Sequence, residues 1–143
     1  MSSPSISVIM PVYNSAEYVE GAIQSILNQS FSDFEFIIIN DGSNDASDDV
    51  ILKFKDDRIV YVKFEVNKGI VAALNFGLSI AKGKYIARMD SDDISFLSRL
   101  EIQFNYLEAN SNVILCGAYM QNLLTNENIL YPINNSEIRI ALS

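Results

Sequence analysis

The sequence predicts an α/β protein with a mostly parallel sheet and helices on both faces. Three observations carry this prediction: four short runs rich in β-branched and aromatic residues, helical apolar spacing between these runs, and apolar residues at almost every strand position. Strands that are apolar on both sides are typical of parallel sheets buried between helices. The 143 residues, 49% of them hydrophobic, suffice for one domain with a sizeable core.

The first half of the chain predicts two strand-helix units. ISVIM (residues 6–10) is the first strand, and Asn14, three residues before Glu17, is expected to start a helix. The apolar residues of that helix are Val19, Ala22, Ile23, Ile26 and Leu27. EFIII (residues 35–39) is the second strand. It ends in NDGSND, which predicts a turn, a cap at Asp45 and a helix containing Val50, Ile51 and Phe54.

The second half continues the alternation. RIVYVKF (residues 58–64) predicts a strand, EVNKG a loop, and YIARM (residues 85–89) a fourth strand. The helix between them contains Val71, Leu74, Leu78 and Ala81. The helix after the fourth strand is expected to bury Leu97, Leu100, Phe104 and Leu107. VILCGAYM then predicts a strand in which Cys116 is buried.

Composition excludes several function classes. Ten basic and eighteen acidic residues give a net charge of −8, which argues against nucleic acid as a partner. With no histidine and one cysteine, an internal disulfide, a Cys/His zinc site and a histidine-dependent triad are excluded. No basic leader and no apolar run of about 18 residues is present, so we expect no membrane span and a cytoplasmic chain, with the inner face of a membrane as an alternative location.

A cluster of residues, most of them with polar side chains, follows each predicted strand. They are Pro11, Val12, Tyr13 and Asn14 after the first, Asp41 after the second, Asn67, Lys68 and Gly69 after the third, and Asp90, Ser91, Asp92 and Asp93 after the fourth. Ligands of open parallel sheets bind outside the carboxyl ends of the strands, where the strand order reverses. We therefore expect these four clusters to share one rim and to form a binding site.

The stretch YIARMDSDDIS places three aspartates within four positions. If the backbone is extended there, Asp90 and Asp92 face the same way about 7 Å apart. Two carboxylates at that distance repel by roughly 2 kcal/mol at an effective dielectric constant near 20. A divalent cation reverses the sign of this interaction, and Mg²⁺ or Mn²⁺ is commonly held by one or two carboxylates together with substrate phosphates.

These motifs resemble the N-terminal half of the family-two glycosyltransferases of the GT-A fold. The resemblance rests on SVIMPVYN, AIQSILNQSFSDFEFIIINDGSND, NKGIVAALNFGLSIAKGKYIARMDSDDIS and RLEIQ, in this order. It implies a Rossmann-like GT-A fold that binds a nucleotide-diphosphate sugar, usually a uridine one, and transfers the sugar with inversion to a saccharide or lipid-linked acceptor.

The same resemblance implies roles for individual residues. Pro11, Val12, Tyr13 and Asn14 would line the nucleotide pocket, Asp41 would lie near the base, and Lys68 would approach the base or a phosphate. The segment Asp90, Ser91, Asp92 would meet ribose and metal, with Asp92 on the metal and Asp90 on ribose or metal. The catalytic base of the family is a carboxylate of the later, acceptor-binding half, so we expect it beyond Ser143. NNSEIRIALS predicts the start of a capped helix, and residues 1–143 are expected to form one nucleotide-sugar-binding domain of a longer enzyme.

Other interpretations remain open at this stage. Asp93 or Ser95 could cap the following helix, Asp41 could be only a turn former, Tyr13 a packing residue and Lys68 a solvated charge. An EF-hand fails because Ile94 and Ser95 replace a ligand and the required glycine. A receiver domain would need acidic residues after the first strand, and a nucleotidyltransferase a glycine-rich basic loop there. A non-catalytic nucleotide-sugar binding module is the alternative function.

Overall fold

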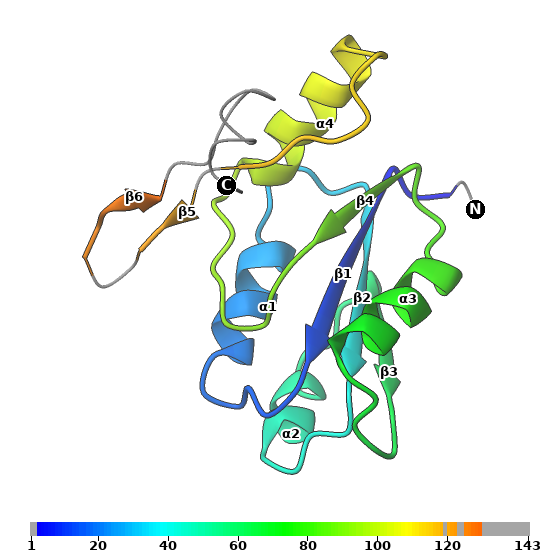
Figure 1. Cartoon of the computed structure of the whole chain (residues 1–143), viewed down its shortest axis with the longest axis vertical. Helices are drawn as coiled ribbons and strands as arrows, with labels where there is room; N and C mark the ends of the chain where they lie inside the picture. Colours follow the sequence, from blue (N-terminus) through cyan, green and yellow to red (C-terminus); the bar gives the residue numbers. More distant parts are fainter. Residues whose placement is uncertain (1–2, 119, 123–124, 130–143) are drawn as a thin grey trace, which may run out of the picture.

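Four strands form one parallel sheet in the order β3-β2-β1-β4 (Figure 1). The computed structural model describes residues 3–118, 120–122 and 125–129. The strands of the sheet are β1 (Ile6–Val12), β2 (Phe34–Asn40), β3 (Ile59–Lys63) and β4 (Tyr85–Arg88). The helices are α1 (Val19–Leu27), α2 (Ser47–Ile51), α3 (Ile70–Ile80) and α4 (Arg99–Ala109). The expected α/β class with a parallel sheet is confirmed.

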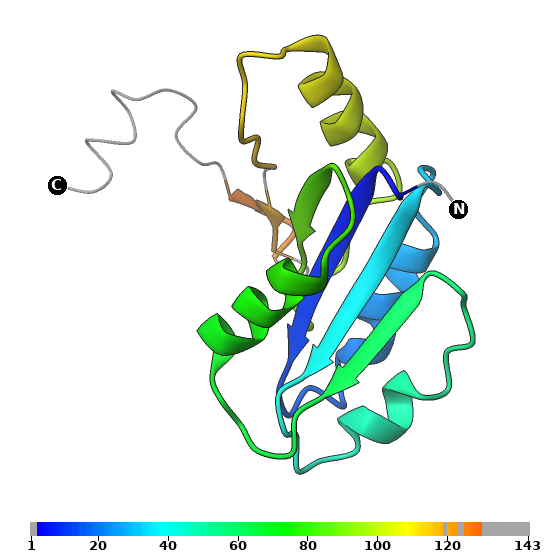
Figure 2. The ribbon, with the colours of Figure 1, turned by 90° about the vertical axis from the view of Figure 1, so that its right-hand side faces the viewer.

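Helices cover both faces of the sheet because β1 and β2 are apolar on both sides. Val8 and Met10 pack in a cluster with residues of α1 and α2, whereas Ile9 packs in a second cluster with Ala73 of α3. Figure 2 shows α1 and α2 on one face of the sheet and α3 on the other. In β2, Phe36 and Ile38 alternate in the same way with Ile37 and Ile39. Each such buried side chain stabilises the fold by about 1.5–3 kcal/mol relative to an exposed one.

The strand order reverses between β1 and β4. The chain runs outward from β1 through β2 to β3, and then crosses back to place β4 on the other side of β1. The last ladder bond between them joins the Met89 N–H to the Ile9 carbonyl at 3.0 Å. Pro11, two residues further on, has no N–H with which to continue this ladder. The two strands therefore separate beyond Ile9 and leave a crevice at their carboxyl ends.

Helix α3 packs through its small residues. Ala73 and Gly77 are buried, whereas Val71 and Leu78, which the sequence analysis assigned to this helix, are exposed. A Cβ atom at Gly77 would lie 2.6 Å from Cγ2 of Ile9, so only glycine allows this close approach.

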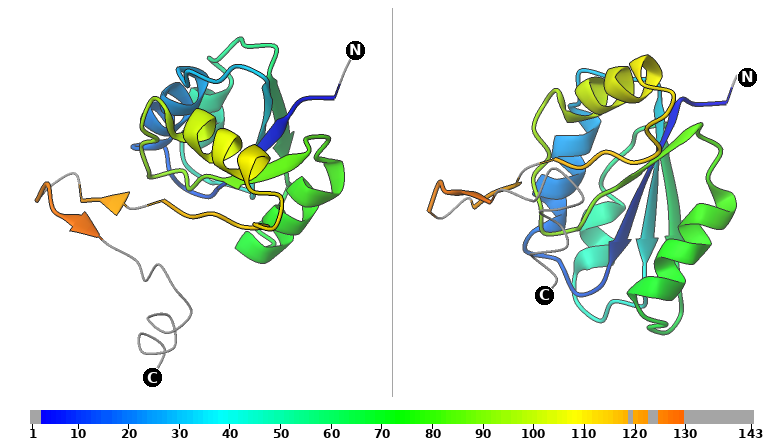
Figure 3. Two further views of the ribbon diagram at one scale, coloured as in Figure 1. Left: turned by 90° about the horizontal axis from the view of Figure 1, so that it is seen from above. Right: turned by 45° about the horizontal axis from the view of Figure 1, so that its top comes forward.

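Helix α4 begins at Arg99 and lies on the same side of the sheet as α1 (Figure 3). The expectation that Asp93 or Ser95 caps it is wrong, because the N-cap is Ser98 and its side chain makes no capping bond. The buried Gln29 side chain, at the end of α1, accepts a hydrogen bond from the Leu100 N–H at 3.0 Å instead. A side chain from the loop after α1, far away in the sequence, thus replaces a local cap.

Further along α4, Phe104 packs against Phe31 and Tyr85, with ring centroids 4.7 and 5.9 Å apart. Of the four residues expected on its buried face, Leu100 is buried, Phe104 and Leu107 are half-buried, and Leu97 is exposed.

Two further sequence expectations are corrected. Helix α1 starts at Val19 and not at Asn14, whose backbone has a φ of 50° and whose side chain accepts a hydrogen bond from the Asn44 N–H at 2.8 Å. Residues 113–118 form no strand, since no other described element pairs with this segment. Cys116 is half-buried and not fully buried as expected. A separate antiparallel pair, β5 (Met120–Gln121) and β6 (Asn128–Ile129), follows. The helix expected in NNSEIRIALS lies outside the described residues.

Candidate functional site

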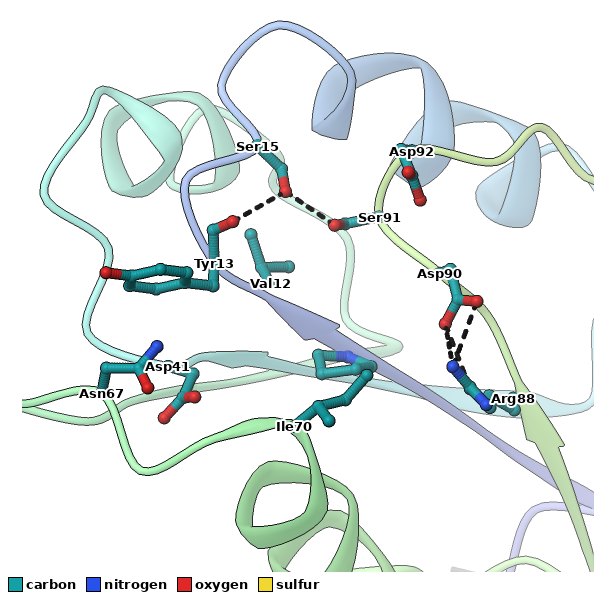
Figure 4. A pocket seen from close by; sticks show the side chains of 11 residues that line it. Val12, Tyr13, Ser15, Asp41, Asn67, Ile70, Arg88, Asp90, Ser91 and Asp92 are labelled. Atoms are coloured by element: carbon teal, nitrogen blue, oxygen red, sulfur yellow. Dashed lines mark hydrogen bonds and ion pairs between the residues drawn. The ribbon is translucent and has the colours of Figure 1, made fainter.

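A pocket of about 430 Å³ lies at the carboxyl ends of the strands, where β1 and β4 separate (Figure 4). It is lined by Pro11, Val12, Tyr13, Ser15, Asp41, Asn67, Ile70, Arg88, Asp90, Ser91 and Asp92. Seven of the residues proposed from the sequence are among them: Pro11, Val12, Tyr13, Asp41, Asp90, Ser91 and Asp92. Together with Asn67, they bring residues from all four expected clusters to one rim.

The exit of β1 supplies one wall of the pocket. The Tyr13 side chain projects beside Asn67 and Asp41, and the residue is 46% exposed, so it is not a core packing residue (Figure 4). The Ser15 hydroxyl donates to the Tyr13 carbonyl at 3.2 Å and lies 2.8 Å from the Ser91 hydroxyl. Ser15 thereby connects the loop after β1 to the segment after β4.

The Asp41 carboxylate organises the wall beside Tyr13. It is only 3% exposed, and it accepts hydrogen bonds from the backbone N–H groups of Lys68 at 2.8 Å and Gly69 at 2.9 Å. Gly69 is the N-cap of α3, with a φ of 88° that favours glycine. Because no side chain caps α3 from within, Asp41 anchors the start of this helix to the end of β2.

Gly42 lets these two segments touch. Its φ is +69°, and a Cβ atom there would lie 2.6 Å from the backbone N of Asn67 and 2.6 Å from the carbonyl carbon of Val66. A larger residue would push the β3-α3 loop away from Asp41.

The acidic segment after β4 is a turn and not an extended strand. The Asp93 N–H donates to the Asp90 carbonyl at 3.3 Å, which places Ser91 and Asp92 at the centre of the turn. The expectation of extended backbone at residues 90–92 is therefore wrong. Partial desolvation raises the pKa of Asp93, and the charges of Asp92 and Asp90 raise this pKa further.

Arg88, the last residue of β4, neutralises part of this charge. Its guanidinium group donates to Asp90 Oδ1 from Nε at 3.1 Å and from Nη2 at 2.9 Å (Figure 4). A second arginine, Arg99, holds the end of β4 in place, because its Nη2 donates a hydrogen bond to the Arg88 carbonyl at 2.8 Å.

Two residues proposed from the sequence do not line the pocket. Asn14 joins the loops after β1 and β2, since its N–H donates to the Ser43 hydroxyl at 3.0 Å and its side chain binds Asn44. The Lys68 ammonium lies 4.4 Å from the centre of the Phe64 ring, a cation-π contact.

Three lining residues were not predicted: Ser15, Ile70 and Arg88. Asn67 was expected on the rim as one of the residues after the third strand, but it was given no role. Arg88 carried a usable signal, because it stands two residues before Asp90 at a strand end.

The donor set suits a hard divalent cation that a substrate helps to bind. Asp90 and Asp92 offer carboxylate oxygens within one turn, and Mg²⁺ and Mn²⁺ prefer such oxygens. Within residues 3–118, 120–122 and 125–129, no three His, Cys, Asp or Glu side chains gather into a metal-binding group. Two protein carboxylates thus fit a site that phosphate oxygens complete, and not an all-protein cage.

A parallel sheet with an acidic turn beside its switch point is the architecture of the GT-A glycosyltransferases. The crystal structure of S. aureus TarS 1-349 in complex with UDP-GlcNAc matches with a TM-score of 0.71 and 26% identity, over 75% of this chain and 32% of that one. Mannosyltransferase PcManGT from Pyrobaculum calidifontis, in complex with GDP-Man and Mn²⁺, matches with a TM-score of 0.60 over 66% of this chain and 29% of that one, and its 24% identity shows the shared fold alone.

Residues 7–140 match the family model described as glycosyl transferase family 2, and the chain belongs to that family. An uncharacterized glycosyltransferase of Methanocaldococcus jannaschii is 42% identical over 134 residues, which are 91% of this chain. The chain spans 46% of that relative's length. In the part of the chain that the structure describes, no helix has the length and apolar character needed to cross a membrane.

Proposed function

We propose that this chain binds the nucleotide-diphosphate sugar donor of an inverting glycosyltransferase, with a uridine nucleotide as the preferred donor. One observation carries the proposal: the ends of β1, β2 and β4 bring Tyr13, Asp41 and Asp92 to a single pocket at the switch point of the sheet. A volume of about 430 Å³ lies within the range of small-ligand sites. The similarity to TarS, which was crystallised with UDP-GlcNAc, supports the choice of uridine.

The base is proposed to lie against Tyr13. An exposed aromatic ring at a pocket edge offers a stacking surface, and its polar neighbours Asn67 and Asp41 can accept or donate hydrogen bonds at the edge of a base (Figure 4). Asp41 uses one oxygen for each loop N–H, but a carboxylate has about four acceptor positions, so it can also accept from a base N–H.

The diphosphate is proposed to lie toward residues 90–92. Asp92, together with Asp90, would hold Mn²⁺ or Mg²⁺ there, with ribose near Ser91. The cation would supply positive charge to the departing diphosphate, which a protein of net charge −8 otherwise repels. This chain's own residues hold the turn in place: Ser91 by its contact with Ser15, and the end of β4 by its bond to Arg99.

The catalytic base is proposed to lie outside residues 1–143. Of the three carboxylates that line the pocket, Asp41 is bound to backbone N–H groups and Asp90 to Arg88, and Asp92 is assigned to the metal. Because no pocket carboxylate is left to act as a base, a second candidate function is a binding module without activity of its own. General-base assistance is typically worth 10²–10⁴ in rate, so we expect these 143 residues to bind a UDP sugar yet to transfer it to no acceptor.

A ligand screen tests the proposed function. Thermal unfolding would be followed with UDP, GDP, CDP and dTDP, each with Mn²⁺ and with EDTA, and with UMP as the monophosphate control. We expect UDP with Mn²⁺ to give the largest rise in unfolding temperature. No stabilisation by any nucleotide would refute donor binding. Radiolabelled UDP sugars with a panel of sugar and lipid acceptors then separate enzyme from module, since transfer by these residues would require a base among them.

A further inference from the structure

Arg88 is the one cation among the pocket-lining side chains that the structure describes. Its guanidinium group uses two donors on Asp90: Nε and Nη2 on Oδ1 at 3.1 and 2.9 Å, and Nη2 also on Oδ2 at 3.2 Å. Both carboxylate oxygens of Asp90 are therefore occupied by an internal cation (Figure 4). The carboxylate keeps free acceptor positions, but a metal ion on Asp90 would bring a second positive charge next to the guanidinium group and so weaken this contact.

The ion pair between Arg88 and Asp90 can break at little cost. Its side chains are 57% and 41% exposed, and ion pairs this exposed contribute little to stability. Arg99 differs, because it is bound at several points: Nη2 to the Arg88 carbonyl at 2.8 Å, Nη1 to Met89 Sδ at 3.4 Å and Nε to Gln103 at 3.3 Å. Of the two arginines at this turn, Arg88 can leave its partner while Arg99 keeps the strand end in place.

We propose that Arg88 is an exchangeable counter-ion: it neutralises Asp90 in the ligand-free protein, and it turns to the diphosphate of the donor when a divalent cation takes Asp90. This inference rests on the proposed function, because it assigns a further donor-binding residue to the same pocket. A guanidinium group suits this second role, since its planar donors match phosphate oxygens in pairs.

The exchange has opposite effects on the two ligands. Arg88 competes with the metal ion for Asp90, so it weakens metal binding in the absence of nucleotide. Once the metal ion is bound, the released guanidinium group adds positive charge for the diphosphate and strengthens nucleotide binding. Metal and nucleotide would therefore bind cooperatively. A residue with a purely structural role would weaken both ligands or neither.

Arg88→Gln tests the exchange, with Arg58→Gln as the matched control. Arg58 also pairs with an aspartate two residues away, Asp56, at 2.8 Å, but it precedes β3 at the opposite end of the sheet. Mn²⁺ affinity would be measured without nucleotide from the paramagnetic resonance signal of free Mn²⁺. UDP affinity would be measured by calorimetry in saturating Mn²⁺.

We expect Arg88→Gln to bind Mn²⁺ about two- to fivefold more tightly than the wild type, the range that an exposed ion pair allows. We expect its UDP affinity in Mn²⁺ to fall about tenfold or more, as for a lost charge-assisted hydrogen bond. Arg88→Lys, which keeps the charge without the planar fork, should recover part of the UDP affinity. Arg58→Gln should change neither affinity.

Unchanged or weaker Mn²⁺ binding by Arg88→Gln would overturn the competition for Asp90. Tighter Mn²⁺ binding with unchanged UDP affinity would overturn the transfer of Arg88 to the diphosphate. If the wild type binds Mn²⁺ but no nucleoside diphosphate, the proposed function fails and the second role of Arg88 fails with it. The Mn²⁺ measurement without nucleotide still decides the competition in that case.

Discussion

The backbone N–H of Gly69 donates a 2.9 Å hydrogen bond to Asp41, and this contact holds the start of α3 against the end of β2. The second Asp41 oxygen binds the Lys68 N–H at 2.8 Å, so both oxygens accept from the same loop. One buried side chain therefore fixes the wall of the pocket that lies beside Tyr13 and Asn67.

Asp41→Asn should destabilise the protein and weaken nucleotide binding. An amide offers one acceptor where the carboxylate offers two, so its NH₂ group would face a loop N–H. Both loop donors belong to exposed or half-buried residues, and the Gly69 N–H keeps a second acceptor in Asn67 Oδ1 at 3.1 Å, so we expect the free energy of unfolding to fall by about 1 kcal/mol. Urea denaturation measures this change, and Asp49→Asn, on the exposed side of α2, is the control. A loss no larger than in the control would show that the loop does not depend on Asp41.

Tyr13→Ala should lower UDP affinity without destabilising the fold. Stacking of a base on an aromatic side chain is worth about 1–3 kcal/mol, so the affinity should fall roughly five- to 150-fold. Because Tyr13 is exposed, the free energy of unfolding should change by about 0.5 kcal/mol or less. Tyr13→Phe keeps the ring and should bind UDP nearly as the wild type does. Calorimetry of both variants checks this, and equal losses in Ala and Phe would instead assign the effect to the hydroxyl.

UDP binding should depend on a divalent cation, whereas uridine binding should not. Phosphate charge is what the acidic turn repels, so removal of Mn²⁺ by EDTA should weaken UDP about tenfold or more, the effect of losing one charge-assisted contact. Uridine contacts only the base and ribose regions and serves as the matched ligand. Calorimetry in both buffers measures the difference. Equal UDP affinity in Mn²⁺ and in EDTA would contradict the metal assignment.

The shared rim could be predicted from the sequence, because the position of each strand along the chain is enough to say which residues follow its carboxyl end. In a parallel sheet the carboxyl ends of all strands share one edge, so Pro11, Asp41 and Asp90 had to converge once their strands were recognised. The strands themselves were recognisable because β1 and β2 are apolar on both sides.

Contacts between distant segments could not be predicted in this way. The left-handed backbone of Asn14 depends on hydrogen bonds with Ser43 and Asn44, 29 and 30 residues away. The capping of α4 by Gln29 crosses 71 residues. Local capping rules propose the nearest suitable side chain and miss both. The turn after β4 was missed for a related reason, since period-two alternation applies only while the strand continues.

Asp93→Asn should stabilise the protein at neutral pH and leave its stability unchanged in acid. The pKa of Asp93 in the folded protein is raised above its ordinary 3.8, first by desolvation and then by Asp92 and Asp90. The charged form is therefore disfavoured on folding, and this penalty is present above the raised pKa and disappears below 3.8. The gain should be about 0.5 kcal/mol or less, as for most surface changes. Urea denaturation between pH 7 and pH 3 measures it, and an advantage that grows toward acid would contradict the direction of the shift.

Asp92→Ala should abolish metal-dependent UDP binding while leaving the fold intact. Asp92 is exposed at the centre of the turn, so its removal costs no buried contact and relieves repulsion on Asp93. We therefore expect an unfolding temperature equal to or slightly above that of the wild type in EDTA. In Mn²⁺, UDP affinity should fall to the value that the wild type shows in EDTA. Asp93→Ala removes the same charge one residue away and should keep the response to Mn²⁺. Calorimetry of the two variants side by side separates a specific metal ligand from a general effect of charge. Normal Mn²⁺-dependent UDP affinity in Asp92→Ala would show that Asp92 does not hold the metal. Equal losses of affinity in both variants would assign the effect to the net charge of the turn.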